Sequence, residues 1–324
     1  MTISVAICTW NRCESLEKTL ERMAAMSVPD FQWELLVVNN NGTDRTNQVC
    51  EQFIGRLPIR LLQEPTPGQS YARNLAIREA KGDQIAWTDD DVLVDANWLT
   101  EIARAFPTHE ADFVFGPSEP EWSGAVPDWY SNRLRGNFAV LDYGPSAFVV
   151  SSKDQPFYGL NFAGTRSAHE ELGMFRTDFG LKGKEGGVGE DVDLFERAFK
   201  RGMRVVYEPS IRVRHMIPAA RATKAYQRRH IWRVNRTYYR HLGEMFPAVP
   251  WFLGLPRFMT VDALANLGRY VRGLATFDKP GRFYSELQLV RFVRLCVEAT
   301  KNGFSKPTTP KPIDQSAVSG GGIS

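Results

Sequence analysis

The sequence has few of the features that mark a disulfide-stapled or membrane-spanning protein. Its 324 residues include four cysteines, which lack the paired spacing of a zinc site: Cys8, Cys13, Cys50 and Cys296. So few cysteines are insufficient to staple a chain of this size, and they favour a reducing, cytoplasmic setting. No uncharged apolar run reaches the roughly 18 to 20 residues that cross a bilayer. The best candidate, residues 245–256, is broken by prolines and followed by Arg257, so we expect no integral membrane segment.

Charge and targeting signals are also sparse. The 40 Lys and Arg residues and 37 Asp and Glu residues give a formal net charge of +3, which is too mild to imply nucleic-acid binding. The sequence opens on an apolar stretch, residues 3–8, without a basic leader or a small-residue cleavage site, so we expect a strand there. With 43% hydrophobic residues, the chain can bury the core of one large α/β domain plus an extension, or of two domains.

Short apolar runs alternate with helical patterns in the first third of the chain. Four runs read as strands: residues 3–8, 35–38, 59–62 and 84–88. Three helical patterns accompany them: Leu16, Leu20 and Met23 at helical spacing, residues 70–80, and a helix that Asp95 would cap and that runs to residue 106. Strands that alternate with helices predict a doubly wound, mostly parallel α/β sheet flanked by helices.

The pattern changes after residue 113. Pro, Gly and aromatic residues dominate residues 113–157, which indicates irregular loops over one edge of the sheet. The remaining elements are predicted as a helix at 191–201, a strand at 204–207 and helices over 224–301. We therefore divide the chain into an α/β domain over residues 1–220, a basic helical extension over 221–304 and a Pro-, Ser-, Thr- and Gly-rich disordered tail over 305–324.

Three consecutive aspartates, Asp89, Asp90 and Asp91, close the fourth predicted strand. Because side chains alternate along a strand, Asp89 and Asp91 can point to the same side. Ligands of open α/β sheets bind beyond the carboxyl ends of the strands, where a nucleotide would sit. Paired carboxylates and diphosphate oxygens together suit Mg²⁺ or Mn²⁺, which can neutralise a diphosphate leaving group. A solvated acidic turn with one helix cap is the plainer alternative.

At this point the chain resembles the family 2 glycosyltransferases of the GT-A fold, in which an Asp-x-Asp motif follows the same strand. The likeness runs from Ser4 to about His215 and includes three further segments: residues 5–12, ending Thr9-Trp10-Asn11-Arg12; residues 37–44, Val-Val-Asn-Asn-Asn-Gly-Thr-Asp; and residues 67–74, Pro-Gly-Gln-Ser-Tyr-Ala-Arg-Asn. It implies that the nucleotide-sugar is bound by Thr9, Asn11, Arg12, Asn39, Arg73, Asp89 and Asp90.

Two of these implied contacts depart from the family pattern or have a simpler reading. Asn39 stands where the family usually has an acidic residue that contacts the base, and an amide both donates and accepts hydrogen bonds. The resemblance favours a UDP-sugar over a GDP- or dTDP-sugar, although this substitution weakens the case for uracil. For Arg73, a charge on an exposed helix face is the alternative to a donor contact.

Glu190 and Asp191 follow a glycine-rich loop, residues 180–189, and precede a predicted helix, residues 192–199. Direct displacement at an anomeric carbon needs a base that removes the acceptor proton. The segment Gly-Glu-Asp-Val-Asp-Leu at 189–194 looks like the family's Glu-Asp motif, which implies Asp191 as the base and Glu190 as a supporting or acceptor-binding group. Without that resemblance, acids in the first turn of a helix would indicate compensation of the helix dipole.

His215 ends a strand-like run, residues 211–213, at the position where some relatives place a histidine close to the metal. The resemblance therefore implies a metal site of Asp89, Asp91 and His215, in which an imidazole suits Mn²⁺ better than Mg²⁺. A structural histidine is the alternative.

Aromatic residues occur in the loop region ahead of the segment that resembles the acceptor side, residues 159–166. Trp122, Trp129 and Tyr130 either stack against a sugar face or cover a core.

Residues 212–240 hold nine Lys or Arg residues and no Asp or Glu. Ile231, Val234, Tyr238 and Leu242 recur at helical spacing beside these charges, which suits an amphipathic helix on an anionic membrane. Packing of this apolar stripe on the domain is an equal alternative, and some of the arginines are candidates for neutralising donor phosphate. No recognised motif for nucleic-acid binding accompanies the charge, so we expect no nucleic-acid partner.

Taken with these residues, the resemblance implies an inverting glycosyltransferase that moves a sugar from a nucleoside-diphosphate sugar to a hydroxyl of a glycan or lipid-linked acceptor. Assembly of bacterial surface polysaccharide or glycolipid at the cytoplasmic face of the membrane is the expected setting. One alternative is a sugar-nucleotide nucleotidyltransferase, whose usual Gly-rich, basic phosphate loop is missing after the first strand. The other is a non-catalytic nucleotide-sugar or glycan-binding module.

Overall fold

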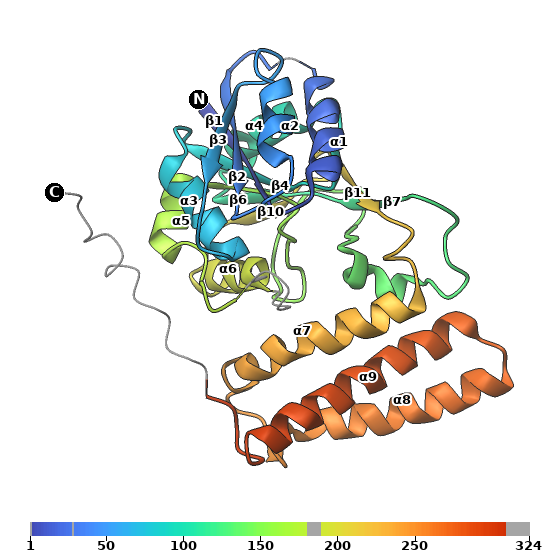
Figure 1. The fold of residues 1–324 in the computed structure, drawn as a ribbon. Coiled ribbons are helices and arrows are strands. Elements are labelled where there is room, and N and C mark those ends of the chain that lie inside the picture. The colour runs from blue at the N-terminus through green and yellow to red at the C-terminus, as the bar shows by residue number, and fades with distance from the viewer. Residues whose placement is uncertain (1, 28, 180–188, 309–324) are drawn as a thin grey trace.

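The computed structural model describes residues 2–27, 29–179 and 189–308 of the chain. At its centre is an eight-stranded sheet with the order β3-β2-β1-β4-β9-β6-β10-β8, and a layer of three long helices lies beside this α/β domain (Figure 1). The strands of the sheet are β1 (Thr2–Thr9), β2 (Gln32–Asn39), β3 (Ile59–Gln63), β4 (Gln84–Asp89), β6 (Phe113–Phe115), β8 (Phe148–Val149), β9 (Asn161–Thr165) and β10 (Val205–Tyr207).

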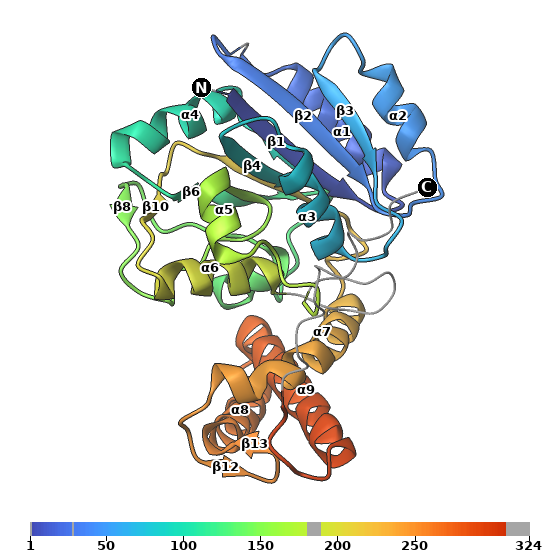
Figure 2. The same ribbon diagram turned by 90° about the vertical axis from the view of Figure 1, so that its left-hand side faces the viewer.

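The four strands predicted in the first third are present and form the parallel half of the sheet. β1 pairs in parallel with β2 and β4, and β2 pairs in parallel with β3. Their apolar runs are continuous because helices cover both faces (Figure 2), so that Val5 enters the core on one face and Ala6 the core on the other. The doubly wound α/β prediction is confirmed. The sheet is mixed because β9 runs antiparallel to both β4 and β6.

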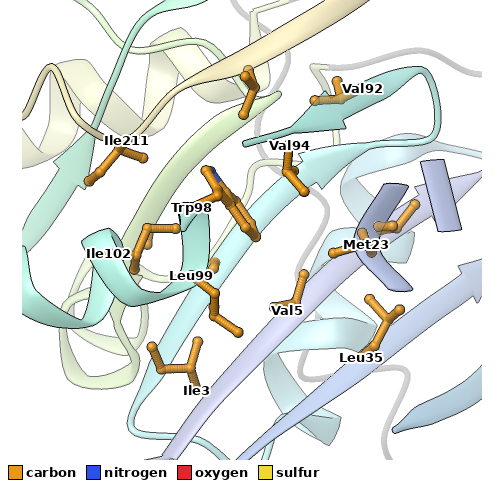
Figure 3. Packing of buried hydrophobic residues seen from close by; sticks show 14 of the residues in the cluster. Ile3, Val5, Met23, Leu35, Val92, Val94, Trp98, Leu99, Ile102 and Ile211 are labelled. Atoms are coloured by element: carbon orange, nitrogen blue, oxygen red, sulfur yellow. The ribbon is translucent and has the colours of Figure 1, made fainter. Parts of the chain in front are cut away.

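Six helices cover the two faces of the sheet. One face packs against α1 (Cys13–Ala24), α2 (Thr46–Gln52) and α4 (Trp98–His109), and the other against α3 (Gln69–Glu79), α5 (Arg166–Leu172) and α6 (Glu190–Lys200). Leu16 and Leu20 of α1, which the helical spacing singled out, are completely buried. Trp98 and Leu99 of α4 point toward the strand that carries Val5 (Figure 3).

Two expectations about this domain are wrong. The helix α4 begins at Trp98. Its N-cap residue is Asn97, two residues after the predicted cap Asp95, and no side chain caps the helix. Residues 113–157 are not only loops, because β6 is fully buried within the central sheet between β9 and β10. A second sheet follows the order β5-β11-β7, with β5 (Val92–Val94), β11 (Val213–Ile217) and β7 (Ser118–Trp122). The strand predicted at 211–213 is therefore β11, which starts later and has His215 at its centre.

The C-terminal layer consists of α7 (Lys224–Met245), α8 (Arg257–Ala275) and α9 (Lys279–Lys301), with the short strands β12 (Trp251–Phe252) and β13 (Leu255–Pro256) between α7 and α8. α9 packs on both α7 and α8, and α7 lies nearest the α/β domain (Figure 1). Val234 and Leu242 of α7 are buried. The apolar stripe of α7 therefore packs inside the protein and is not exposed to a membrane.

The predicted tail is described only up to residue 308, where Pro307 is buried against α7. The rest of the tail lies outside the described residues, as does the glycine-rich loop at 180–188. None of the described helices is long and apolar enough to cross a membrane.

Candidate functional site

A cavity of about 370 Å³ opens at the carboxyl ends of β1 and β4. Six residues singled out from the sequence line it: Thr9, Arg12, Asp89, Asp90, Asp91 and His215. Thr9 is the last residue of β1, and Asp89 is the last residue of β4. Because β1 and β4 are parallel neighbours, their carboxyl ends bring these two segments to the same edge of the sheet.

Asp90 is held between Thr9 and Arg12 in the cavity wall. Thr9 Oγ1 donates to Asp90 Oδ2 at 2.7 Å, and Arg12 Nη1 lies 2.8 Å from Asp90 Oδ1. The residue is only 3% exposed. Burial raises the pKa of Asp90 to about 7, against the opposing attraction of Arg12. Asp90 is therefore able to take up or release a proton near neutral pH.

Asp91 is surrounded by three basic side chains. Its Oδ2 lies 2.5 Å from Arg12 Nη2, 3.1 Å from Arg221 Nη1 and 3.2 Å from His215 Nε2. Burial favours the neutral acid, but the interactions with His215, Arg12 and Arg221 together hold the pKa of Asp91 below its ordinary value. Asp91 is therefore an anion at the centre of a positively charged shell.

His215 reaches Asp91 through the pairing of β5 with β11. In this antiparallel register His215 lies opposite Val92, the residue after Asp91, and Met216 N donates to the Asp91 carbonyl oxygen at 2.8 Å. The ring is oriented by its other nitrogen, because Nδ1 donates to the carbonyl oxygen of Phe138 at 2.7 Å. The nitrogen that faces Asp91 is therefore Nε2.

Asp91 Oδ2 and His215 Nε2 lie close enough together to bind one cation between them. Two acceptor atoms 3.2 Å apart need a proton or a cation between them, and Arg221 Nη1 lies 3.1 Å from the oxygen and 3.3 Å from the nitrogen. A carboxylate and an imidazole fit Mn²⁺ in kind. The third predicted ligand, Asp89, faces Arg73 instead.

Within residues 2–27, 29–179 and 189–308, no three His, Cys, Asp or Glu side chains gather around one point that could hold a metal. Of the three predicted ligands, Asp91 and His215 lie together and are candidates for holding a metal. Sites of the Mg²⁺ type commonly use one or two protein ligands and complete the coordination with substrate phosphates and water. The donor set therefore fits a metal that binds together with a diphosphate.

Arg73 lies beneath the cavity and is only 3% exposed, so the alternative of a charge on an exposed helix face is wrong. Its Nη2 lies 3.6 Å from Asp89 Oδ1, and its Nη1 lies 3.3 Å from Glu190 Oε1. Gly159 packs directly against the guanidinium, since a Cβ there would lie 2.2 Å from Arg73 Nη2. Arg73 therefore forms ion pairs with both Asp89 and Glu190.

Burial perturbs both acids that Arg73 joins. Desolvation raises the pKa of Asp89, and it raises the pKa of Glu190 to about 7, while the positive charge of Arg73 opposes the shift in each case. Glu190 is buried, with only 5% of its surface exposed.

Asp191 stands next to this cluster, in the first turn of α6. Its Oδ2 accepts from Gly159 N at 2.6 Å, and its Oδ1 accepts from Val192 N at 2.9 Å. Asp191 is partly exposed, whereas its neighbour Glu190 is buried. Gly159 is followed by Leu160, which lines the cavity. Backbone donors therefore fix an accessible carboxylate beside the cavity wall.

Asn11 and Asn39 hold the turn that follows β2. Asn39 Oδ1 accepts from Gly42 N at 2.8 Å, and its Nδ2 donates to Asn47 Oδ1 at 2.8 Å. Asn11 Oδ1 accepts from Thr43 N at 2.7 Å. Both polar ends of Asn39 are paired and the residue is 3% exposed, so its placement does not support the base contact that the resemblance implied.

Among the residues that line the cavity but were not assigned to the site from the sequence are Trp10, Arg221 and Arg233. Arg221 and Arg233 belong to the basic run, for which contact with donor phosphate was one open alternative. Arg233 lies in a row of exposed arginines at helical spacing on α7: Arg229, Arg233, Arg236 and Arg240. The sequence does not distinguish Arg221 and Arg233 from the other arginines of the basic run. Which arginines face the cavity depends on the path that the folded chain takes past it.

The aromatic side chains ahead of the site cover a core. Trp129 is 5% exposed and its ring centroid lies 4.6 Å from that of Phe283 on α9. Trp122 and Tyr130 pack against Phe138 in the same cluster. Of the two readings of these residues, the structure supports packing between the α/β domain and the helical layer.

Comparisons with known proteins agree with this architecture. The family model described as "Glycosyl transferase family 2" matches residues 4–173. The succinoglycan biosynthesis protein ExoM of Rhizobium meliloti (strain 1021) is 29% identical over 248 residues, which cover 75% of this chain and 75% of that protein. The glucosyl-dolichyl phosphate glucuronosyltransferase of Haloferax volcanii is 24% identical over 223 residues, which cover 67% of this chain and 70% of that protein.

Solved structures share the fold. The mannosyltransferase PcManGT from Pyrobaculum calidifontis, in complex with GDP-Man and Mn²⁺, matches with a TM-score of 0.63 at 18% identity and covers 93% of this chain and 87% of its own. Residues 1–349 of Staphylococcus aureus TarS, in complex with UDP, match with a TM-score of 0.53 at 17% identity and cover 94% of this chain and 92% of their own. At these identities the likeness shows the fold alone, which is the GT-A fold.

Proposed function

The chain belongs to glycosyl transferase family 2, and we propose that its cavity binds a nucleoside-diphosphate sugar with a divalent metal and that the sugar is transferred to an acceptor hydroxyl with inversion. The observation that carries this proposal is the meeting of Asp91 with His215, Arg12 and Arg221 in one cavity wall. Acidic ligands alone would suit a cation, and arginines alone would suit an anion. Their combination at a strand end suits a metal diphosphate.

Asp91 and His215 are the proposed protein ligands of the metal, with Asp89 as a third ligand if its carboxylate leaves Arg73. A bound Mn²⁺ or Mg²⁺ would neutralise charge on the departing diphosphate. Arg221, which contacts both ligands, would then be released to contact phosphate oxygens. Arg12 and Arg233 line the same cavity and suit the same anion.

Asp191 is the proposed base. Its carboxylate removes the proton of the acceptor hydroxyl, whose oxygen forms a bond to the anomeric carbon while the bond to the diphosphate breaks and the nucleoside diphosphate leaves. The backbone N–H of Gly159 holds one carboxylate oxygen, and the partial exposure of Asp191 leaves it accessible to an acceptor. Arg73 keeps Asp89 and Glu190 at fixed positions beside it.

The acceptor is proposed to be a glycan or a lipid-linked sugar in the assembly of a surface polysaccharide or glycolipid. Support comes from the names of two relatives, a succinoglycan biosynthesis protein and a glucosyl-dolichyl phosphate glucuronosyltransferase. We propose a UDP-sugar as donor. The structural neighbours were solved with GDP-Man in one case and UDP in another, so the test must include several bases.

The first test is donor hydrolysis on the full chain, which needs no known acceptor. UDP-, GDP- and dTDP-sugars are incubated with Mn²⁺, with Mg²⁺ or with a chelator, and the released nucleoside diphosphate is quantified. We expect metal-dependent release from one donor class and its loss in Asp91→Ala. Asp154→Asn, which changes an exposed acid away from the cavity, is the matched control.

Each outcome separates the competing functions. A non-catalytic module would bind donor without releasing nucleotide, with or without metal. A nucleotidyltransferase would release pyrophosphate from a nucleoside triphosphate and a sugar 1-phosphate. Product with retained anomeric configuration, observed by NMR once an acceptor is known, would contradict the inverting mechanism.

A further inference from the structure

The outer face of α8 carries a row of exposed apolar side chains: Val261 (66% exposed), Leu264 (67%), Leu267 (49%), Val271 (57%) and Leu274 (48%). Their spacing of three or four residues places them on one side of the helix. The opposite side, with Met259, Ala263 and Gly273, is buried where α8 packs on α9. α8 is therefore apolar on two sides, and the chain itself covers only one of them.

Exposed aromatic and aliphatic residues extend this face at both ends of α8. Phe252, the last residue of β12, and Leu253, which follows it in the turn to β13, are each 56% exposed and precede the helix, and Phe277, 86% exposed, follows it. α8 forms the edge of the helical layer that lies farthest from the α/β domain (Figure 1). Contiguous apolar surface of this kind is uncommon on soluble proteins and marks a contact site.

The charges around this face are mostly positive. At about 100° per residue, Arg257 and Arg272 lie within about 40° of Val261 on the helix surface, and both are exposed. Arg269 and Asp262, the one acid in the sequence of α8, lie about 80° and 100° from Val261 and so point away from the row. The apolar row is therefore combined with two arginines, Arg257 and Arg272.

We propose that this face of α8, with Phe252, Leu253 and Phe277 at its ends, docks on a membrane surface that contains anionic lipids. Apolar side chains enter the boundary between headgroups and acyl chains, while the arginines reach back to lipid phosphates at the same depth. A second copy of the chain fits less well, because it would bring Arg257 and Arg272 against identical positive charges and desolvate them without partners. The charge on the face thus selects lipid as its occupant.

This docking surface differs from the one expected on α7. The apolar stripe of α7 is packed, and its Arg233 faces the cavity. The helix α8 lies on the side of the helical layer away from the α/β domain (Figure 1). The cavity is lined by residues of that domain, by Arg221 and by Arg233 of α7, so docking through α8 would leave it uncovered. The proposal does not depend on the identity of the donor or on catalysis.

The test is co-sedimentation of the full chain with vesicles of phosphatidylcholine alone or of phosphatidylcholine with phosphatidylglycerol. We expect binding to the vesicles that contain phosphatidylglycerol, weaker binding to phosphatidylcholine, and a decrease at high salt. Leu264→Glu and Val271→Glu should each lower the partition coefficient about tenfold or more. Arg257→Gln and Arg272→Gln should each lower it about fivefold on anionic vesicles and little on neutral ones.

Ile54→Glu is the matched control, because Ile54 is 68% exposed on the α/β domain and should bind vesicles like the wild type. Thermal melting of each variant establishes that the fold is intact. Absence of wild-type binding to either vesicle, or equal binding by Leu264→Glu, would overturn the proposal. So would a wild-type dimer in light scattering that Leu264→Glu converts to a monomer without any vesicle binding, which would assign the face to a second copy.

Discussion

Asp91 Oδ2 and His215 Nε2 lie 3.2 Å apart although 124 residues separate them in the sequence. They meet because β5 starts one residue after Asp91 and pairs antiparallel with β11, whose centre is His215. Arg221 Nη1 lies within hydrogen-bonding distance of both atoms. A single arginine nitrogen thus contacts both of the atoms that we propose as metal ligands.

Arg221→Gln should strengthen the binding of Mn²⁺ in the absence of donor, because the substitution removes a cation that competes for Asp91 and His215. We expect a dissociation constant about tenfold lower, which corresponds to one hydrogen bond to a charged group. The same variant should raise the KM for donor, because it removes a proposed phosphate contact. Isothermal titration calorimetry with Mn²⁺ measures the first effect, and Arg229→Gln on the exposed face of α7 serves as control. Unchanged Mn²⁺ affinity in Arg221→Gln would argue against a metal between Asp91 and His215.

Asp191→Asn should lower kcat about 10²- to 10⁴-fold and leave the dissociation constant of the donor nearly unchanged, because the amide cannot take up the acceptor proton. Transfer to a defined acceptor and donor binding by calorimetry measure the two quantities. Glu196→Gln changes an exposed ion pair on the same helix and should behave like the wild type. A loss of donor binding equal to the loss of turnover would assign Asp191 to substrate binding.

The pKa of Asp90 predicts a pH dependence of stability. Because the pKa in the folded protein is about 7 and the ordinary value is 3.8, the folded state binds more protons than the unfolded state between these values. This carboxyl therefore lowers the free energy of unfolding as pH rises from about 4 to about 7. Asp90→Asn should show a smaller loss of stability between pH 5 and pH 8, measured by urea unfolding at both values. A remaining slope is expected from Glu190, whose pKa is also raised to about 7. Identical slopes in wild type and variant would refute the assignment.

Arg73→Met should destabilise the fold by about 3 to 5 kcal/mol near pH 8, because it leaves Asp89 and Glu190 without their buried counter-charge. The loss should be smaller near pH 6, where the raised pKa of Glu190 lets that carboxyl bind a proton and become neutral. Urea unfolding at the two pH values tests both statements. Arg78→Met, at an exposed position of the same helix, provides the comparison. Equal destabilisation by the two variants would show that the buried ion pairs of Arg73 add no stability.

Local patterns predicted the parallel half of the sheet well. The four strands and the first helix were found because each buries a face whose apolar spacing is visible within about ten residues, as for Leu16 and Leu20. The strand β6 was missed because three buried residues, Phe113 to Phe115, are too short a run to distinguish from the aromatic loops around them. The cap of α4 was placed two residues early because both Asp95 and Asn97 are residue types that favour such positions.

The amino-acid sequence by itself determined that three aspartates end an apolar strand of an α/β sheet, because the strand and the acids are adjacent in the chain. It also determined the excess of arginine in residues 212–240, which is likewise local. The tertiary structure alone decided that His215 and Arg221 meet Asp91, that Arg73 lies buried beneath the cavity, and that one apolar face of α8 is left uncovered. Those facts depend on which strands pair and which helices pack, and such contacts join residues whose separation in the chain leaves no local pattern.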